Sequence, residues 1–186
     1  MMIIGITGSI ASGKSTVARL IAKKKYPLFS ADKVVTDLYK NNNFINLLVK
    51  KFKLDRKKKI KPQIQFLAKK NKKKLTKLES IIHPLVREKM KNFLKIQSKV
   101  VILEIPLLIE NKLNKYFDKI IFVDSKKETR LKRYLKRNYD KKLFEILDKR
   151  QLPVVNKKKK CDLIVNNNYS IAILKKNIKK IVEDYV

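Results

Sequence analysis

All three glycines of this chain of 186 residues lie within its first thirteen positions, as Gly5, Gly8 and Gly13. A chain that avoids glycine elsewhere and gathers it in one segment is expected to need special backbone geometry there. Residues 8–15 read Gly-Ser-Ile-Ala-Ser-Gly-Lys-Ser and fit the pattern G-x(4)-G-K-[ST]. A strand-like apolar run precedes this segment and a helical pattern follows it. The sequence therefore predicts a phosphate-binding loop between a strand and a helix, rather than a glycine turn beside a stray lysine.

The chemistry of such a loop predicts a role for most of its residues. Glycines let backbone N–H groups turn toward the phosphates, and the N-terminus of the following helix adds partial positive charge. Lys14 is expected to reach the β- and γ-phosphates of ATP, and the Ser15 hydroxyl to lie on Mg²⁺. We expect the Lys14 ammonium to face solvent in the free protein. The residues predicted to bind the nucleotide are Gly8, Ala11, Ser12, Gly13, Lys14, Ser15 and Thr16.

Short β-rich apolar runs alternate with helical patterns along the chain. The runs typical of buried parallel strands are 3–7, 27–30, 100–105, 119–123 and 163–165. Helical patterns cover 15–24, 84–97, 126–137 and the tail from Ile171, with Pro84 placed in a first helical turn. This alternation predicts a doubly wound α/β fold around a mainly parallel, five-stranded sheet.

Two stretches carry helical patterns without a convincing strand. We predict a nucleotide-binding core from residues 1–33, 83–125 and 152–186. Residues 34–82 are then a helical insert after the second strand, and residues 126–151 are a second helical excursion that carries arginines. The second excursion is expected to act as a lid.

Two carboxylates lie at the ends of predicted strands, on the carboxyl edge of the sheet where α/β proteins bind ligands. Asp32 follows the second strand and is positioned either to accept a proton from an acceptor hydroxyl or to cap the helix that starts at Lys33. Glu104 closes the run Val100–Leu103. It is predicted either to hold Mg²⁺, as a Walker-B acid does, or to be a strand-end carboxylate without a metal.

Arg133 and Arg137 lie four residues apart and are predicted to share one helix face. Arginines on a mobile lid can neutralise the charge of a transferring phosphoryl group and exclude water, although a solvated charged face is the alternative. His83, the single histidine, is predicted to be structural or to contact substrate. The predicted catalytic residues are Lys14, Asp32, Arg133 and Arg137.

The formal net charge is +32, but only seven of the 48 basic residues are arginine. Nucleic-acid readers favour the bidentate arginine fork, whereas here lysine is spread over the whole chain. Much of the charge is therefore interpreted as compositional, although it would attract anionic substrates.

The single cysteine, Cys161, excludes an internal disulfide and is interpreted as a small buried residue. Without a membrane-length apolar run or a signal peptide, we expect a cytoplasmic protein with no membrane or specific nucleic-acid partner.

Several further segments follow the loop in a specific order. They are Ser30-Ala31-Asp32, Ile82-His83-Pro84-Leu85, Pro106-Leu107-Leu108-Ile109-Glu110, Leu131-Lys132-Arg133-Tyr134-Leu135-Lys136-Arg137 and Cys161-Asp162-Leu163-Ile164-Val165-Asn166-Asn167. Together with the loop, this ordered set resembles the dephospho-CoA kinase family over nearly the whole chain. The loop itself is shared by many nucleotide-binding proteins, so the later segments carry the specificity of the resemblance.

The resemblance implies transfer of the ATP γ-phosphoryl group to the 3′-hydroxyl of dephospho-CoA, with residues 34–82 as the coenzyme-binding insert. In that family Asp32 matches the proposed base and Arg133 and Arg137 match the lid arginines. Gln151 and Lys157 fall at the family's Gln-x(5)-Lys spacing. The chain departs from the family at three positions, where Asp, Arg and Ala are replaced by Ser30, Leu147 and Cys161.

The alternatives are another small-molecule kinase with the same loop, acting on a nucleoside monophosphate, a nucleoside or shikimate, and a basic nucleic-acid-binding NTPase. Asp32 and His83 are the predicted substrate contacts, and Ser15 and Glu104 the predicted Mg²⁺ ligands. The protein is expected to be a monomer or a weak homo-oligomer.

Overall fold

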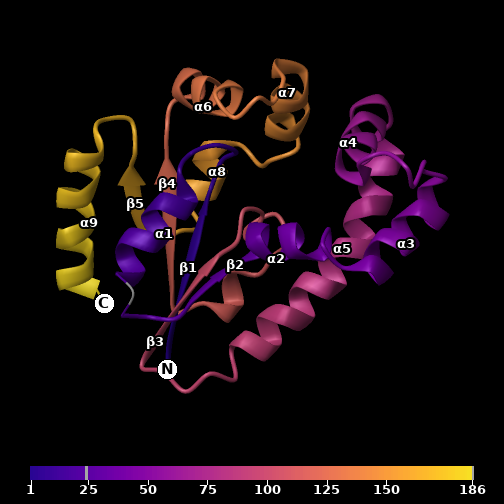
Figure 1. Cartoon of the computed structure of the whole chain (residues 1–186). Coiled ribbons are helices and arrows are strands. Elements are labelled where there is room, and N and C mark those ends of the chain that lie inside the picture. Colours follow the sequence, from indigo (N-terminus) through magenta and orange to yellow (C-terminus); the bar gives the residue numbers. More distant parts are fainter. Residues whose placement is uncertain (24, 186) are drawn as a thin grey trace. The chain divides into compact units, whose positions relative to one another are not determined.

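A computed structural model describes residues 1–23 and 25–185 and contains one five-stranded sheet (Figure 1). All four strand pairings are parallel, and the strand order is β2-β3-β1-β4-β5. The strands are β1 (Met2–Gly8), β2 (Leu28–Ser30), β3 (Val100–Glu104), β4 (Lys119–Asp124) and β5 (Leu163–Asn166). The predicted α/β fold is confirmed, and each predicted strand is present with its ends shifted by at most one residue.

Strand β1 lies at the centre of the sheet and determines where a ligand can bind. It pairs with β3 on one side, where Ile4 is opposite Ile102, and with β4 on the other, where Ile6 is opposite Ile121. The strands that come later in the chain are thus added on both sides of β1. In sheets of this kind, the crevice for a ligand opens at the carboxyl ends of the strands where this reversal occurs. The glycine-rich loop begins at that end of β1.

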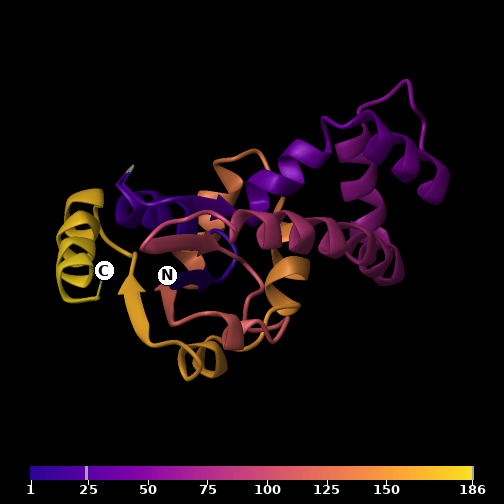
Figure 2. The ribbon, with the colours of Figure 1, turned by 90° about the horizontal axis from the view of Figure 1, so that it is seen from below.

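Helices cover both faces of the sheet (Figure 2). On one face, α1 (Lys14–Ala22) and α9 (Ile171–Tyr185) pack their apolar side chains against the strands. Val17 and Ile21 lie four residues apart on α1 and are fully buried. Leu174 and Ile178 have the same spacing on α9, and their exposed fractions are 3% and 2%. The short α8 (Val154–Lys158) lies on the opposite face (Figure 2). The sheet core is therefore closed on both sides, which holds the strand ends in fixed positions.

Between β4 and α8 the chain forms two helices, α6 (Lys127–Leu135) and α7 (Lys141–Lys149). They pack together through Tyr134, Leu143 and Phe144, all buried, and two partly buried residues of the glycine-rich loop, Ile10 and Ala11, join this cluster. The α6–α7 segment therefore contacts the loop directly through apolar side chains.

Residues Ala31–Lys95 form a separate compact unit, and Met1–Ser30 with Ile96–Val186 form the other. The helical unit contains α2 (Ala31–Leu38), α3 (Asn42–Phe52), α4 (Ile60–Lys70) and α5 (Lys72–Phe93). Its core consists of Phe44, Leu48, Phe52, Ile60, Ile64, Leu78 and Ile82. Across the described ranges of both units, no helix combines the length and the apolar character that a membrane span requires.

The predicted start of a helix at Pro84 is wrong, because Pro84 lies inside the long helix α5. Proline lacks an N–H group and cannot donate to the carbonyl four residues earlier, so it usually begins or kinks a helix. Here Leu78 and Ile82 before the proline are buried in the core of the helical unit, and Leu85 and Val86 after it pack against the same core. Apolar contacts on both sides of Pro84 favour a continuous helix over a break.

Candidate active site

The loop after β1 adopts the backbone geometry that its glycines permit. Gly13 has φ 96° and ψ 22° and caps α1. A Cβ atom at Gly13 would lie 2.2 Å from Nδ2 of Asn167, and one at Gly8 would lie 2.5 Å from the carbonyl oxygen of Val123. Ala11, with φ 58°, takes a left-handed conformation without being glycine. Glycine is therefore required at positions 8 and 13 by backbone angle, and at position 8 also by close packing against the backbone of Val123.

Lys14 does not face solvent in the free protein, contrary to the expectation from sequence. Its exposed fraction is 7%, and its ammonium nitrogen donates a hydrogen bond to the carbonyl oxygen of Ser9 at 3.0 Å. The N–H group of Ser12 donates to the same carbonyl at 3.1 Å. The lysine side chain thus folds back across the loop, where burial limits the number of conformations open to its long stem. Its ammonium is placed at the loop itself.

The Glu104 carboxylate lies at the end of β3 and is only 1% exposed. Its Oε1 accepts a hydrogen bond from the Ser15 hydroxyl at 2.5 Å, and its Oε2 accepts one from the Ser30 hydroxyl at 2.8 Å. These three side chains come from α1, β2 and β3 and meet at the carboxyl edge of the sheet. Sequence analysis did not anticipate the role of Ser30, which supplies a hydroxyl donor to Glu104.

This oxygen-rich cluster fits a magnesium ion. Mg²⁺ prefers oxygen ligands, keeps several waters, and is usually held by one or two carboxylates together with substrate phosphates. Glu104 and Ser15 supply one carboxylate and one hydroxyl within hydrogen-bond distance of each other. Among the residues that the structure describes, no group of three or more His, Cys, Asp or Glu side chains gathers into an all-protein metal site. The donor set therefore suits a metal that arrives with a nucleotide.

Arg133 of α6 contacts the loop through its guanidinium group. Its Nη1 donates to the carbonyl oxygen of Ser12 at 3.3 Å, and its Nη2 donates to the carbonyl oxygen of Asn167 at 2.9 Å. The Asn167 side chain also donates to the Ser12 carbonyl, at 2.8 Å. One loop carbonyl thus accepts from both side chains. Arg133 and Asn167 are 121 and 155 residues away from Ser12 in the sequence, and the fold brings them together at the loop.

Arg137 does not share the α6 face with Arg133, because the helix ends at Leu135. The N–H group of Arg137 donates to the Tyr134 carbonyl three residues back, and Asn138 then takes a left-handed conformation with φ 59°. The side chain of Arg137 is exposed in this turn. Burial lowers the pKa of Arg133 from its ordinary value, and repulsion from Arg137 lowers it further. The two guanidinium groups therefore influence each other electrostatically, although only Arg133 lies on the helix.

Asp32 lies in the first turn of α2, which begins at Ala31. Asp32 therefore follows the first residue of the helix, so the prediction that it caps a helix starting at Lys33 is wrong. Its side chain is exposed, and its carbonyl accepts from the Thr36 hydroxyl at 2.9 Å. A carboxylate in the first turn of a helix interacts favourably with the partial positive charge of the helix N-terminus.

His83 lies well inside α5, directly before Pro84, and is half-buried. The helix predicted to start at Pro84, directly after it, starts instead at Lys72. Its role as a structural or substrate-contacting residue stays a prediction.

Besides Ser30, two residues of the site were missed by sequence analysis as functional candidates. Asn167 directly follows β5, so its place at the carboxyl edge of the sheet was a usable signal. Arg130 is 4% exposed; its side chain donates to the Ser125 carbonyl at 3.1 Å and pairs with Asp148 at 2.6 Å. An arginine one turn before Arg133 carries no local sign of burial, so its role could be found only from the fold.

Cys161 is a protonated thiol at neutral pH. Burial, with a smaller contribution from Asp162, raises its pKa to about 11. Its Sγ donates to the Lys157 carbonyl at 3.1 Å. Because the thiolate is the reactive form of cysteine, this residue is chemically quiet. It is only partly buried, whereas the sequence interpretation was a buried residue.

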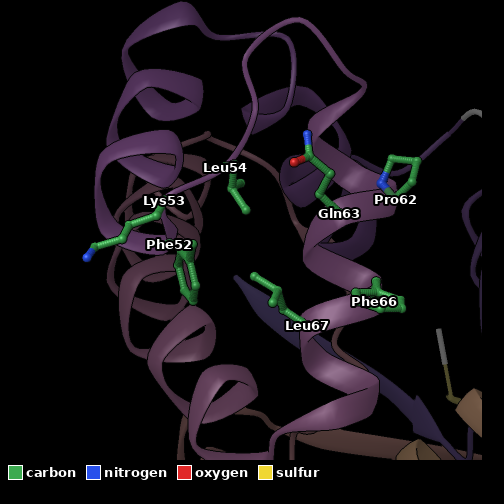
Figure 3. A pocket seen from close by; sticks show the side chains of 7 residues that line it. All are labelled: Phe52, Lys53, Leu54, Pro62, Gln63, Phe66 and Leu67. Atoms are coloured by element: carbon green, nitrogen blue, oxygen red, sulfur yellow. The ribbon is translucent and has the colours of Figure 1, made fainter.

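The helical unit contains a shallow hollow of about 390 Å³ between the end of α3 and α4 (Figure 3). Its lining consists of Phe52, Lys53, Leu54, Pro62, Gln63, Phe66 and Leu67. Gln63 fixes the connecting loop, since its side chain accepts from the Asp55 N–H at 3.0 Å and donates to the Asp55 carbonyl at 2.7 Å. Neither Asp32 nor His83 lines this hollow.

Comparison with known proteins agrees with this geometry. The family model for dephospho-CoA kinase matches residues 2–172. A dephospho-CoA kinase from Fusobacterium nucleatum subsp. nucleatum is 35% identical over 194 residues, covering 98% of both chains. The crystal structure of TT1252 from Thermus thermophilus has a TM-score of 0.79 at 27% identity and covers 100% of this chain and 98% of its own. A dephospho-CoA kinase from Campylobacter jejuni has a TM-score of 0.68 at 27% identity, covering 98% and 96%. The chain therefore belongs to the dephospho-CoA kinase family.

Proposed function

We propose that this protein transfers the γ-phosphoryl group of ATP to the 3′-hydroxyl of dephospho-CoA, giving coenzyme A and ADP. The chain belongs to the dephospho-CoA kinase family, and the observation that carries the proposal is how its charged and hydroxyl side chains are arranged around the glycine-rich loop. Lys14 lies on the loop, the Glu104–Ser15 pair lies at its helix start, and Arg133 contacts it from α6. This arrangement provides two cations and one oxygen cluster for a triphosphate.

The residues of the loop would bind and orient the nucleotide. The backbone N–H groups at the start of α1 and the Lys14 ammonium offer hydrogen bonds to phosphate oxygens, which requires Lys14 to leave the Ser9 carbonyl. Ser15 and Glu104 would hold Mg²⁺, which supplies charge neutralisation to the phosphates when it is bound. Arg133 would stabilise the charge that develops on the transferring group, and its contact with the loop shortens the distance that it must move.

An acceptor screen tests the proposed function. We expect ADP release in the presence of ATP and Mg²⁺ to depend on dephospho-CoA, with AMP, adenosine and shikimate giving little or none. A dedicated site rejects acceptors that leave its buried polar groups unpaired, so the preference should exceed about 10³-fold. Equal or faster ADP release with another acceptor would assign the protein to that substrate. The product should be identified as coenzyme A by mass.

We further propose that the enzyme works in the cytoplasm, as a monomer or a weak homo-oligomer, without a specific nucleic-acid partner. The spread of lysine over the entire sequence supports the last of these points, because a nucleic-acid reader gathers its basic residues, arginine especially, on one face.

Conservative replacement of the two arginines should affect turnover more than nucleotide binding. Arg133→Lys keeps the charge but loses the planar fork that reaches the Ser12 and Asn167 carbonyls together. We expect kcat to fall about 10²-fold, with the Kd for ATP changed less than about threefold, because the guanidinium acts mainly in the transition state. Arg137→Lys should show the same pattern with a smaller stability loss, since its side chain is exposed. Equal losses in ATP binding and kcat would instead indicate ground-state binding.

A further inference from the structure

Lys157 differs from the many surface lysines of the chain because it is fully buried, with an exposed fraction of 0%. It lies in α8, and its ammonium nitrogen donates to Oε1 of Glu110 at 2.9 Å and to Oε1 of Gln151 at 3.3 Å. The same nitrogen lies 5.8 Å from the centre of the Phe122 ring in β4. A buried ammonium ion is tolerated only where its charge and N–H groups are compensated in this way.

The Gln151 side chain extends this network to the phosphate-binding loop. Its Oε1, which accepts from Lys157, also accepts from the N–H group of Ile10 at 3.3 Å. The carbonyl of Ile10 accepts from Nη1 of Arg130 at 3.4 Å, and Arg130 is itself paired with Asp148. Both backbone polar groups of one loop residue are therefore held by side chains from outside the loop. The N–H group of Ile10 is directed to Gln151 rather than toward a phosphate.

Glu110 fixes the same region from a second direction. Its Oε1 accepts from the N–H group of Leu152 at 3.2 Å as well as from Lys157. The segment that follows α7 is thus held to the core both through the Gln151 side chain and through the neighbouring backbone. Gln151 consequently has little freedom to move away from Ile10.

We infer that Lys157 and Gln151 are positioning residues for the phosphate-binding loop, acting through the N–H group of Ile10 and without touching substrate. Phosphate-binding donors are effective only when they are held near their working geometry before the ligand arrives, and a displacement of ~1 Å is costly. The buried Lys157 holds Gln151, and Gln151 holds the loop. This inference rests on the proposed function only in taking ATP as the ligand of the loop.

Direct measurement of ATP binding tests the inference. Gln151→Leu removes the acceptor of the Ile10 N–H group, and Lys157→Met removes the ammonium that fixes it. We expect each variant to raise the Kd for ATP, measured by calorimetry without acceptor, about tenfold, which corresponds to ~1.4 kcal/mol. The double variant should raise the Kd for ATP by no more than about tenfold, because both changes act through one contact. Gln151→Glu keeps an acceptor oxygen and should bind ATP within about twofold of wild type.

Lys158→Met is the matched control. Lys158 is the next residue in α8 and pairs with Asp124 at 2.5 Å, so this variant loses a lysine and an ion pair but not the contact with Gln151. It should bind ATP like wild type.

Lys157→Met leaves Glu110 buried without its cation, so this variant can fail to fold. In that case Gln151→Leu decides alone, since it retains the Glu110–Lys157 pair. A folded Gln151→Leu variant with wild-type affinity for ATP would overturn the inference. The binding assay contains no acceptor, so it remains valid even if the acceptor screen shows that dephospho-CoA is not the substrate.

Discussion

Replacing Lys14 with alanine should reduce kcat by at least about 10³-fold, the largest effect that we expect from any single side chain of the loop. The lysine supplies the one positive charge that belongs to the loop itself, and its ammonium lies against the Ser9 carbonyl. Phosphoryl transfer depends almost entirely on positioning and charge neutralisation, with little covalent chemistry for the protein to perform. Loss of this cation therefore removes stabilisation that neighbouring side chains cannot replace.

The burial of Lys14 changes how this experiment is designed. Because the side chain is only 7% exposed, alanine leaves a void and is expected to lower stability as well as activity. Lys14→Met fills most of that volume without the charge, so it separates the two effects. We expect Lys14→Met to melt close to wild type and to be as inactive as Lys14→Ala. Lys23→Ala, an exposed lysine at the end of the same helix, should keep normal kcat. A kcat near normal in Lys14→Met would contradict the phosphotransferase mechanism.

The strands and the loop could be predicted because their signals are local. The three central strands, β1, β3 and β4, are short apolar runs that are mostly buried, and the loop is a contiguous pattern of glycine, lysine and serine. The continuous helix α5 could not be predicted, because local chemistry places Pro84 at a helix start. Packing on either side of the proline outweighs that preference.

The contacts within the site are a different case, because they join residues far apart in the sequence. Arg133 and Asn167 reach the Ser12 carbonyl, and Ser30 reaches Glu104 across 74 residues. A sequence pattern indicates which residue types are available at the strand ends, but hydrogen-bond partners follow from strand order and register. Even the burial of Lys14 depends on how the loop closes, which no local pattern determines.

Asp32→Asn should lower kcat by roughly two orders of magnitude while leaving ATP binding unchanged. We propose that this carboxylate receives the proton of the acceptor hydroxyl. Chain connectivity supports the proposal, because Asp32 follows Ser30, the last residue of β2, by two positions, and consecutive Cα atoms lie about 3.8 Å apart. Ser30 contacts Glu104 in the oxygen cluster, so Asp32 is tethered within about 7.6 Å, Cα to Cα, of a residue of that cluster.

The expected size of the effect follows from the chemistry of phosphoryl transfer. General-base catalysis contributes ~10²–10⁴-fold, and the lower end applies here because a largely dissociative transition state needs little early deprotonation of the nucleophile. Asparagine keeps the shape and one acceptor oxygen of Asp32, so dephospho-CoA should bind nearly as before, and loss of a first-turn charge should cost less than ~1 kcal/mol of stability. Asp37→Asn is the control, because Asp37 is an exposed carboxylate of the same helix paired with Lys40, and it should keep wild-type kcat. If Asp32→Asn instead lost thermal stability while each folded molecule kept its normal rate, Asp32 would serve only the helix, and the base would have to be sought elsewhere.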